Sequence, residues 1–267
     1  MSIRDWIEQQ QIRGMTTFSF EDVRQALPNL SLGNIMTSLS RLAKAHMISP
    51  VQKKFYVITP PTNRGDGIVH PYYYLDNLLH KIGRDYYVCL ASAAALHGAS
   101  HQAVMTSYVM LPYPQITFSN RRNNQITWTY RREIPTDFLE ERQTETGYIK
   151  VSNPELTALD LVQYSQHTGG LSHVATILVE LSERLDFSRQ DGLVLTHSTC
   201  TTIQRLGYIL DETLGFHDIA DMLCELWHHY YKRVQYTPLC SQSPTQPFSR
   251  NEHWKIDVNT TLEIDDL

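Results

Sequence analysis

The chain has 267 residues, of which 42% are hydrophobic, and its formal net charge is −5 at pH 7. This length allows two domains, and the composition supports a real hydrophobic core. No apolar run approaches the roughly 20 residues that cross a bilayer, and no signal peptide is evident, so we expect a cytoplasmic protein without a membrane partner.

The first sixty residues predict a winged helix-turn-helix. Ser19 lies three residues before Asp22, a spacing typical of a capping box at a helix start. Ser31 is a suitable N-cap for the longest of the helices, the expected recognition helix. Two β-type runs around Gln52-Lys53-Lys54 predict a hairpin, which would be the wing. The expected helices and strands cover residues 2–11, 20–27, 31–45, 47–51 and 55–58.

The expected recognition helix has two different faces. Ile35, Leu39 and Leu42 recur at helical spacing, with Met36 and Ala43 beside them, and form an apolar stripe. The opposite face carries short hydrogen-bonding groups and cations and no acid, and such side chains reach base edges and phosphates in a major groove. Together with two hairpin lysines that would touch phosphate, the candidate DNA-binding residues are Ser31, Asn34, Thr37, Ser38, Arg41, Lys44, Lys53 and Lys54.

Charge is divided unevenly along the chain. Residues 1–60 contain seven Lys or Arg and four Asp or Glu, a net charge of +3, which leaves −8 for the remainder. A basic module on an acidic body favours a DNA-binding head carried by a domain with another role. The alternative is that the head serves protein interaction or dimerisation and that its polar helix face is merely solvated.

The fold class expected for the whole chain is α+β. We predict a winged helix-turn-helix over residues 1–60, a linker over residues 59–65 and a second α+β domain over residues 66–267. This mixed domain begins with helices and strands and becomes helical after residue 153. Asn153 is the expected N-cap of the next helix, and Pro154 is its expected first residue. The expected elements are helices over 72–82 and 86–97, strands over 107–111, 115–118, 125–131 and 148–151, later helices that include 201–214 and 218–232, and a strand over 254–258.

No group of residues predicts catalysis, a metal site or a cofactor. His97 and His101 are four apart, but Gly98 interrupts the helix and no acidic third ligand is near. The four cysteines form no Cys-x-x-Cys pair, and the motifs of nucleotidyltransferases, nucleases and P-loop proteins are missing. The pairs Arg121-Arg122 and Arg131-Arg132 would meet phosphate or guard a sheet edge with charge.

Several stretches, in this order, resemble AbiEi-type antitoxins of type IV toxin–antitoxin systems, an abortive-infection family. They are the N-terminal helix-turn-helix pattern, the small-residue helix that ends in His-Gly over residues 86–98, the Asn-Pro-Glu segment over 151–161, the Arg-Leu-Gly-Tyr helix over 204–210, and the ending with Trp254, Val258 and Asn259.

The resemblance implies an antitoxin that represses its own operon through the winged helix and counters a separate nucleotidyltransferase-like toxin through its C-terminal domain, not always in a stable complex. By this resemblance, the eight candidate residues would contact operator DNA. The roles of Arg205 and Gly207 stay open, with a packing contact as one interpretation. We also expect cooperative binding or a homodimer on paired half-sites, because a single such head binds weakly.

Two other functions stay open at this point. One is a winged-helix transcription regulator, unrelated to a toxin, whose second domain senses a small ligand. The other is a nuclease with a DNA-targeting head, against which the missing acidic triad argues.

Overall fold

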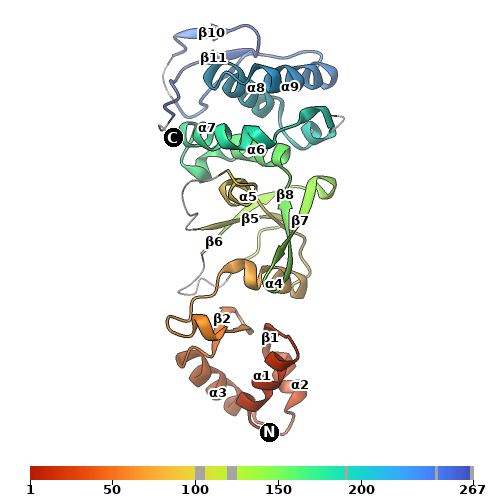
Figure 1. Cartoon of the computed structure of the whole chain (residues 1–267), viewed down its shortest axis with the longest axis vertical. Helices are drawn as coiled ribbons and strands as arrows, with labels where there is room; N and C mark the ends of the chain where they lie inside the picture. The colour runs from red at the N-terminus through yellow and green to blue at the C-terminus, as the bar shows by residue number, and fades with distance from the viewer. Residues whose placement is uncertain (100–105, 119–124, 190–191, 244–245, 265–267) are drawn as a thin grey trace. The chain divides into compact units, whose positions relative to one another are not determined.

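The computed structural model describes residues 1–99, 106–118, 125–189, 192–243 and 246–264, and within them the chain is α+β, as predicted (Figure 1). Two compact units are present. One combines Met1–Tyr86, Leu111–Ile134 and Glu141–Ile149, and the other combines Tyr87–Met110, Pro135–Glu140 and Lys150–Leu267. Within the described part, no helix is both long and apolar enough to span a bilayer.

The N-terminal elements follow the sequence prediction to within one residue at each end. Their order is α1 (Ile3–Ile12), β1 (Thr17–Ser19), α2 (Phe20–Ala26), α3 (Leu32–Lys44), β2 (Ile48–Gln52) and β3 (Phe55–Ile58). The strands form an antiparallel sheet in the order β1-β3-β2, in which the short β1 was not predicted. These elements form the red-to-orange part of the chain in Figure 1.

Side-chain caps fix the starts of these helices. In α2 the Ser19 side chain accepts a hydrogen bond from the Asp22 N–H, and the Asp22 carboxylate accepts one from the Ser19 N–H at 2.7 Å. Ser2 and Asp5 form the same capping box on α1. Burial acts to raise the pKa of Asp22, but the hydrogen bonds from Ser19 outweigh it and leave the pKa below its ordinary value.

One hydrophobic core closes this region. Trp6 meets Phe18 edge-to-face with ring centroids 5.4 Å apart, and Phe18 stacks on Tyr56 at 5.3 Å. The core brings all three helices together over the sheet, which is why α3 buries only one stripe. Its buried members are Ile3, Trp6, Ile7, Phe18, Phe20, Val23, Leu27, Ile35, Leu39, Ile48 and Ile58.

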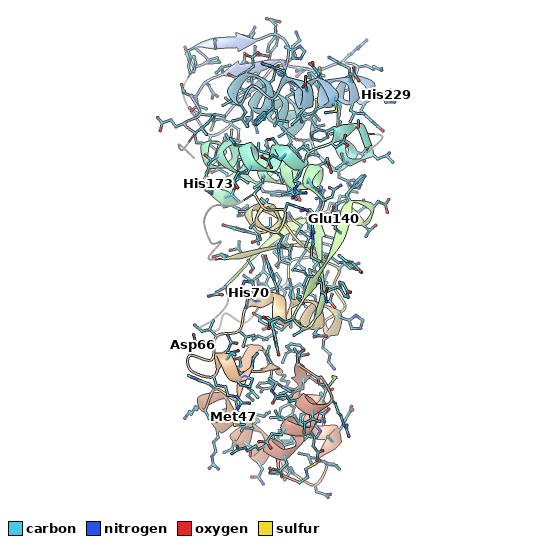
Figure 2. The ribbon with its side chains drawn as sticks, in the orientation of Figure 1. Met47, Asp66, His70, Glu140, His173 and His229 are labelled. Carbon is cyan, nitrogen blue, oxygen red and sulfur yellow. The ribbon has the colours of Figure 1, made fainter. Side chains whose placement is uncertain are left out.

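The segment expected to be a linker is tied to β2 by hydrogen bonds. The Ser49 hydroxyl donates to the Gly67 carbonyl at 2.6 Å and lies 3.2 Å from the buried Thr59 hydroxyl. Met47 accepts a hydrogen bond from the Thr59 N–H, and the chain then passes through Asp66 (both Met47 and Asp66 are labelled in Figure 2). A Cβ on Gly67, whose φ is +72°, would lie 3.0 Å from the His46 ring, so glycine is required there.

A five-stranded sheet follows the helix α4 (Leu75–Lys81), in the order β6-β5-β4-β8-β7. The central strand β4 is antiparallel to β5, with Val88 opposite Val109, and parallel to β8, with Val88 opposite Val151. The bounds are β4 Tyr87–Val88, α5 Leu90–Leu96, β5 Ser107–Pro112, β6 Ile126–Arg131, β7 Leu139–Thr144 and β8 Gly147–Ser152.

Helices and a small sheet end the chain. Asn153 caps α6 by accepting from the Leu156 N–H, and Pro154 occupies its first position, as the sequence predicted. The short sheet has the order β10-β11-β9, and β10 and β11 lie beside α8 and α9 in Figure 1. The elements are α6 (Pro154–Gln163), α7 (Leu171–Leu181), α8 (Cys200–Tyr208) continued by a π-helical turn (Ile209–Thr213), α9 (His217–Tyr230), β9 (Thr237–Pro238), β10 (Ser249–Asn251) and β11 (Ile256–Val258).

Two expectations for the middle of the chain were wrong. Residues 86–97 are not one helix, because β4 pairs with β5 first and the helix begins only at Leu90, whose φ is +53°. Residues 115–118 are not a strand. The Tyr130 hydroxyl accepts from the Ile116 N–H and donates to the Ile116 carbonyl, so these backbone groups bond to a side chain instead of a neighbouring strand.

Candidate nucleic-acid interface

The helix α3 presents most of the predicted residues to solvent. Ile35 and Leu39 are fully buried beneath it, while Asn34, Thr37, Arg41 and Lys44 are exposed. Ser31 is exposed and caps the helix, since its hydroxyl accepts from the Asn34 N–H at 3.2 Å. Ser38 is half-buried, nearer the core than the sequence suggested.

Sequence reasoning missed other exposed residues of this helix. Met36 was placed beside the apolar stripe, yet its side chain is 63% exposed, and Leu32 is 54% exposed. Gly33 and Ser40 are exposed as well. On a helix, residues four apart lie on the same face, so Leu32 and Met36 are neighbours, as are Gly33 and Thr37. The exposed surface of α3 is therefore part polar, part basic and part apolar.

The hairpin between β2 and β3 carries the two predicted lysines, and both are exposed at its turn. Lys54 has a φ of +61°, in the left-handed region. Its carbonyl accepts a hydrogen bond from the Phe20 N–H at 2.9 Å, and its ammonium lies 5.3 Å from the centre of the Phe20 ring. The tip of the hairpin is thus fixed to the start of α2.

Neither α3 nor the hairpin contains an acidic residue. The sequence has no Asp or Glu between Asp22 and Asp66. The ion pairs of the described N-terminal region use the acids of α1 and α2, in Arg4–Glu8, Arg24–Glu21 and Lys81–Asp22. No salt bridge among the described residues involves the four exposed cations of α3 and the hairpin, so their charge is available to a polyanion.

The other residues that the sequence analysis singled out do not form a second candidate site among the described residues. His97 is buried, and its Nε2 lies 2.7 Å from the Ser152 carbonyl, while His101 lies outside the described residues. Arg131 is only 7% exposed, so it does not guard a sheet edge with charge. Arg121-Arg122 lies outside the described residues, and the described part of the chain contains no cluster of three or more potential metal ligands.

The comparison with protein families matches the middle of the chain. Residues 86–212 match the family described as the AbiEi antitoxin C-terminal domain. This segment is an AbiEi antitoxin domain. The match confirms the resemblance to AbiEi-family antitoxins, and it supports an antitoxin role in a toxin–antitoxin system.

The comparison with solved structures supports the fold beyond the AbiEi domain. The crystal structure of the RV2827C protein from Mycobacterium tuberculosis aligns with a TM-score of 0.65 and 15% sequence identity. The alignment covers 94% of this chain and 88% of that one. At this identity the likeness concerns the fold alone. The search of curated proteins finds no match.

The Arg-Leu-Gly-Tyr helix of the AbiEi domain, α8, packs against residues near the C-terminus. A Cβ on Gly207 would lie 2.1 Å from the Trp254 ring, so the absent side chain makes room for a fully buried indole. Arg205 donates from Nε and Nη2 to the Pro238 carbonyl, at 3.1 and 2.9 Å. The Gln204 amide donates to three backbone carbonyls, including that of Trp254. The motif is therefore a packing contact, which was one of the interpretations left open by the sequence.

Proposed function

We propose that this protein is the antitoxin of a type IV toxin–antitoxin system and the repressor of its own operon. The N-terminal region would bind operator DNA as a winged helix-turn-helix, and the AbiEi domain would counter a nucleotidyltransferase-like toxin. The AbiEi match supports the antitoxin half of this proposal. The N-terminal region supplies the argument for the repressor half.

The single observation that carries DNA binding is the basic, acid-free surface made by α3 and the hairpin on a closed core. The order α1-β1-α2-α3-β2-β3, with a short turn between α2 and α3, is the order of a winged helix-turn-helix. In such domains the second helix of the pair enters the major groove, and a hairpin reaches the backbone beside it.

Each predicted residue has a role in this arrangement. Asn34 and Thr37 lie on the first turns of α3, where they would contact base edges. Arg41 and Lys44 lie in its last turn, and Lys53 and Lys54 at the hairpin, where they would contact phosphates. The remaining two candidates would act at the margins, because Ser31 caps the helix and Ser38 is half-buried.

The number of these contacts argues for paired binding. One head with a handful of phosphate and base contacts binds DNA weakly. A homodimer or cooperative assembly on two half-sites, about one helical turn apart, would double the contacts.

The toxin would be countered without a requirement for a stable complex between the two proteins.

Binding to the chain's own upstream DNA tests the repressor half. Fluorescence anisotropy should detect tight binding by the full chain, and Arg41→Ala and Lys44→Ala should each weaken it about tenfold, the effect of losing one charged contact. The matched control is Lys232→Ala, an exposed lysine outside the N-terminal region, which should bind as the unchanged chain does. No binding by the unchanged chain would refute the repressor role, and a small molecule that copurifies and changes binding would favour the ligand-responsive alternative.

Growth of cells that express the nucleotidyltransferase-like toxin proposed to share the operon tests the antitoxin half. Co-expression of the full chain should restore growth. The double variant Arg41→Ala/Lys44→Ala should also restore growth when both proteins are expressed from an unrelated promoter, because the AbiEi domain is unchanged. A failure of the unchanged chain to restore growth would contradict the antitoxin role and leave DNA binding as a separate result.

A further inference from the structure

The recognition surface of α3 is divided along its length. Its first half, residues 32–39, contains no Arg or Lys, and its exposed side chains include the apolar Leu32 and Met36. Both cations, Arg41 and Lys44, lie in the last turn. A helix that docks in the major groove contacts bases mainly through its N-terminal residues. The part of α3 that would meet base edges therefore carries no charge, and its exposed side chains are both polar and apolar.

The exposed glycine of α3 adds to this picture. Gly33 has an ordinary helical backbone, and a Cβ added there would meet nothing within 4 Å. Neither packing nor backbone geometry explains a residue that costs a helix up to about 1 kcal/mol against alanine. A glycine lets another surface approach the backbone closely. Its place between Leu32 and Asn34, on the exposed first turn, is where a base pair would approach.

These features match the edge of an A·T base pair. In the major groove thymine presents a C5-methyl group, the apolar feature of that edge, while adenine pairs with an amide side chain such as Asn34. Guanine is read most often by Arg or Lys, and the first half of α3 offers neither. Resting on the proposed function, we infer that α3 reads A·T pairs in its operator, with Leu32 and Met36 against thymine methyl groups and Asn34 at adenine.

The charge around the apolar residues favours DNA as their occupant over a second copy of the chain. Leu32 and Met36 share the exposed face of α3 with Arg41 and Lys44, and no acid lies between Asp22 and Asp66. Two copies of this face would bring like charges together, which is unfavourable. A duplex would supply both the negative charge and the methyl groups.

Replacing thymine by deoxyuridine removes only the methyl groups. The full chain is titrated against its own upstream duplex made with dT and against the same duplex made with dU. The unchanged chain should bind the dU duplex about fourfold more weakly for each methyl contact, the equivalent of about 0.8 kcal/mol. Met36→Ala should weaken binding to the dT duplex and reduce the difference between the two duplexes. Met15→Ala, an exposed methionine outside α3, is the matched control and should keep the full difference.

A second variant separates recognition from folding. Gly33→Ala should leave the free energy of unfolding equal or higher, because the added methyl meets nothing, yet it should weaken DNA binding. Equal affinity of the unchanged chain for the dT and dU duplexes would overturn the inference. So would a Met36→Ala variant that changes self-association while keeping the difference. A chain that binds neither duplex would refute the proposed function and this inference together.

Discussion

The close approach of Gly207 to Trp254 makes a quantitative prediction about stability. In Gly207→Ala the new methyl carbon would lie 2.1–2.3 Å from three atoms of the indole ring, whereas carbon atoms in contact lie about 3.5–4.0 Å apart. The ring has no room to withdraw. It is fully buried, stacks on Trp227 at 5.5 Å, and donates from its Nε1 to an Asp211 carboxylate oxygen at 2.9 Å.

Three effects set how far Gly207→Ala lowers the free energy of unfolding. Overpacking of a filled core costs about 1–3 kcal/mol. Displacement of the ring would also weaken the bond to Asp211, which contributes about 1 kcal/mol. The higher helix propensity of alanine offsets up to about 1 kcal/mol of this destabilisation. Gly207→Ala should therefore lower the free energy of unfolding by about 1–3 kcal/mol.

Urea unfolding followed by tryptophan fluorescence measures this loss, since Trp227 and Trp254 lie together in the affected unit. The matched control is Gly33→Ala, also a helical glycine without a positive φ, where a methyl group meets nothing within 4 Å. The control should be as stable as the unchanged chain or more so. If Gly207→Ala unfolds at the same urea concentration as Gly33→Ala, the packing argument is refuted.

Three further predictions concern single side chains. Lys54→Gly should raise the free energy of unfolding by up to about 1 kcal/mol, measured in urea, because relief of a positive φ outweighs loss of the ammonium contact with Phe20, and it should still weaken DNA binding. Gln204→Glu should lower that free energy by about 3 kcal/mol, seen as an earlier urea transition, because a carboxylate would face three carbonyl oxygens. The hydrogen bond to Asp211 holds the pKa of His217 above 6.5. The stability it contributes is thus present below pH 6.5 and lost as pH rises through the folded pKa. An NMR titration should find that pKa closer to 6.5 in Asp211→Asn, and an unchanged value would contradict the assignment.

Local signals were sufficient to predict the N-terminal elements. Ser19 with Asp22 and the N-cap Ser31 are short-range features, and the helices that they start begin where the sequence placed them. Asn153-Pro154 predicted the start of α6 for the same reason. Such caps act within one turn of helix, so they can be read without knowledge of the fold.

Elements that depend on distant partners were missed. The strand β7 (Leu139–Thr144) has the sequence LEERQT, which offers little β propensity, and it forms because β8 pairs with it at a sheet edge. Tyr87–Val88 reads as the start of a helix, and its pairing with β5 decides otherwise. Burial of Arg131 likewise depends on neighbours that the sequence does not name.

The candidate site was only partly predictable. Periodicity identified the cations and polar residues of α3, but it treats every apolar residue near the stripe as core. Met36 shows the limit of that rule, because its side chain is 63% exposed. The exposed apolar residues of α3, Leu32 and Met36, were identified only from the burial of each residue.

The salt dependence of binding to upstream DNA tests the central claim most directly. If the cations of α3 and the hairpin contact phosphates, the logarithm of the binding constant should fall linearly with the logarithm of the NaCl concentration. Arg41→Ala, Lys44→Ala and Lys53→Ala should each reduce that slope by about one, while Lys232→Ala should leave it unchanged. A flat salt response, or equal slopes in all four variants, would contradict the assignment of this surface to DNA.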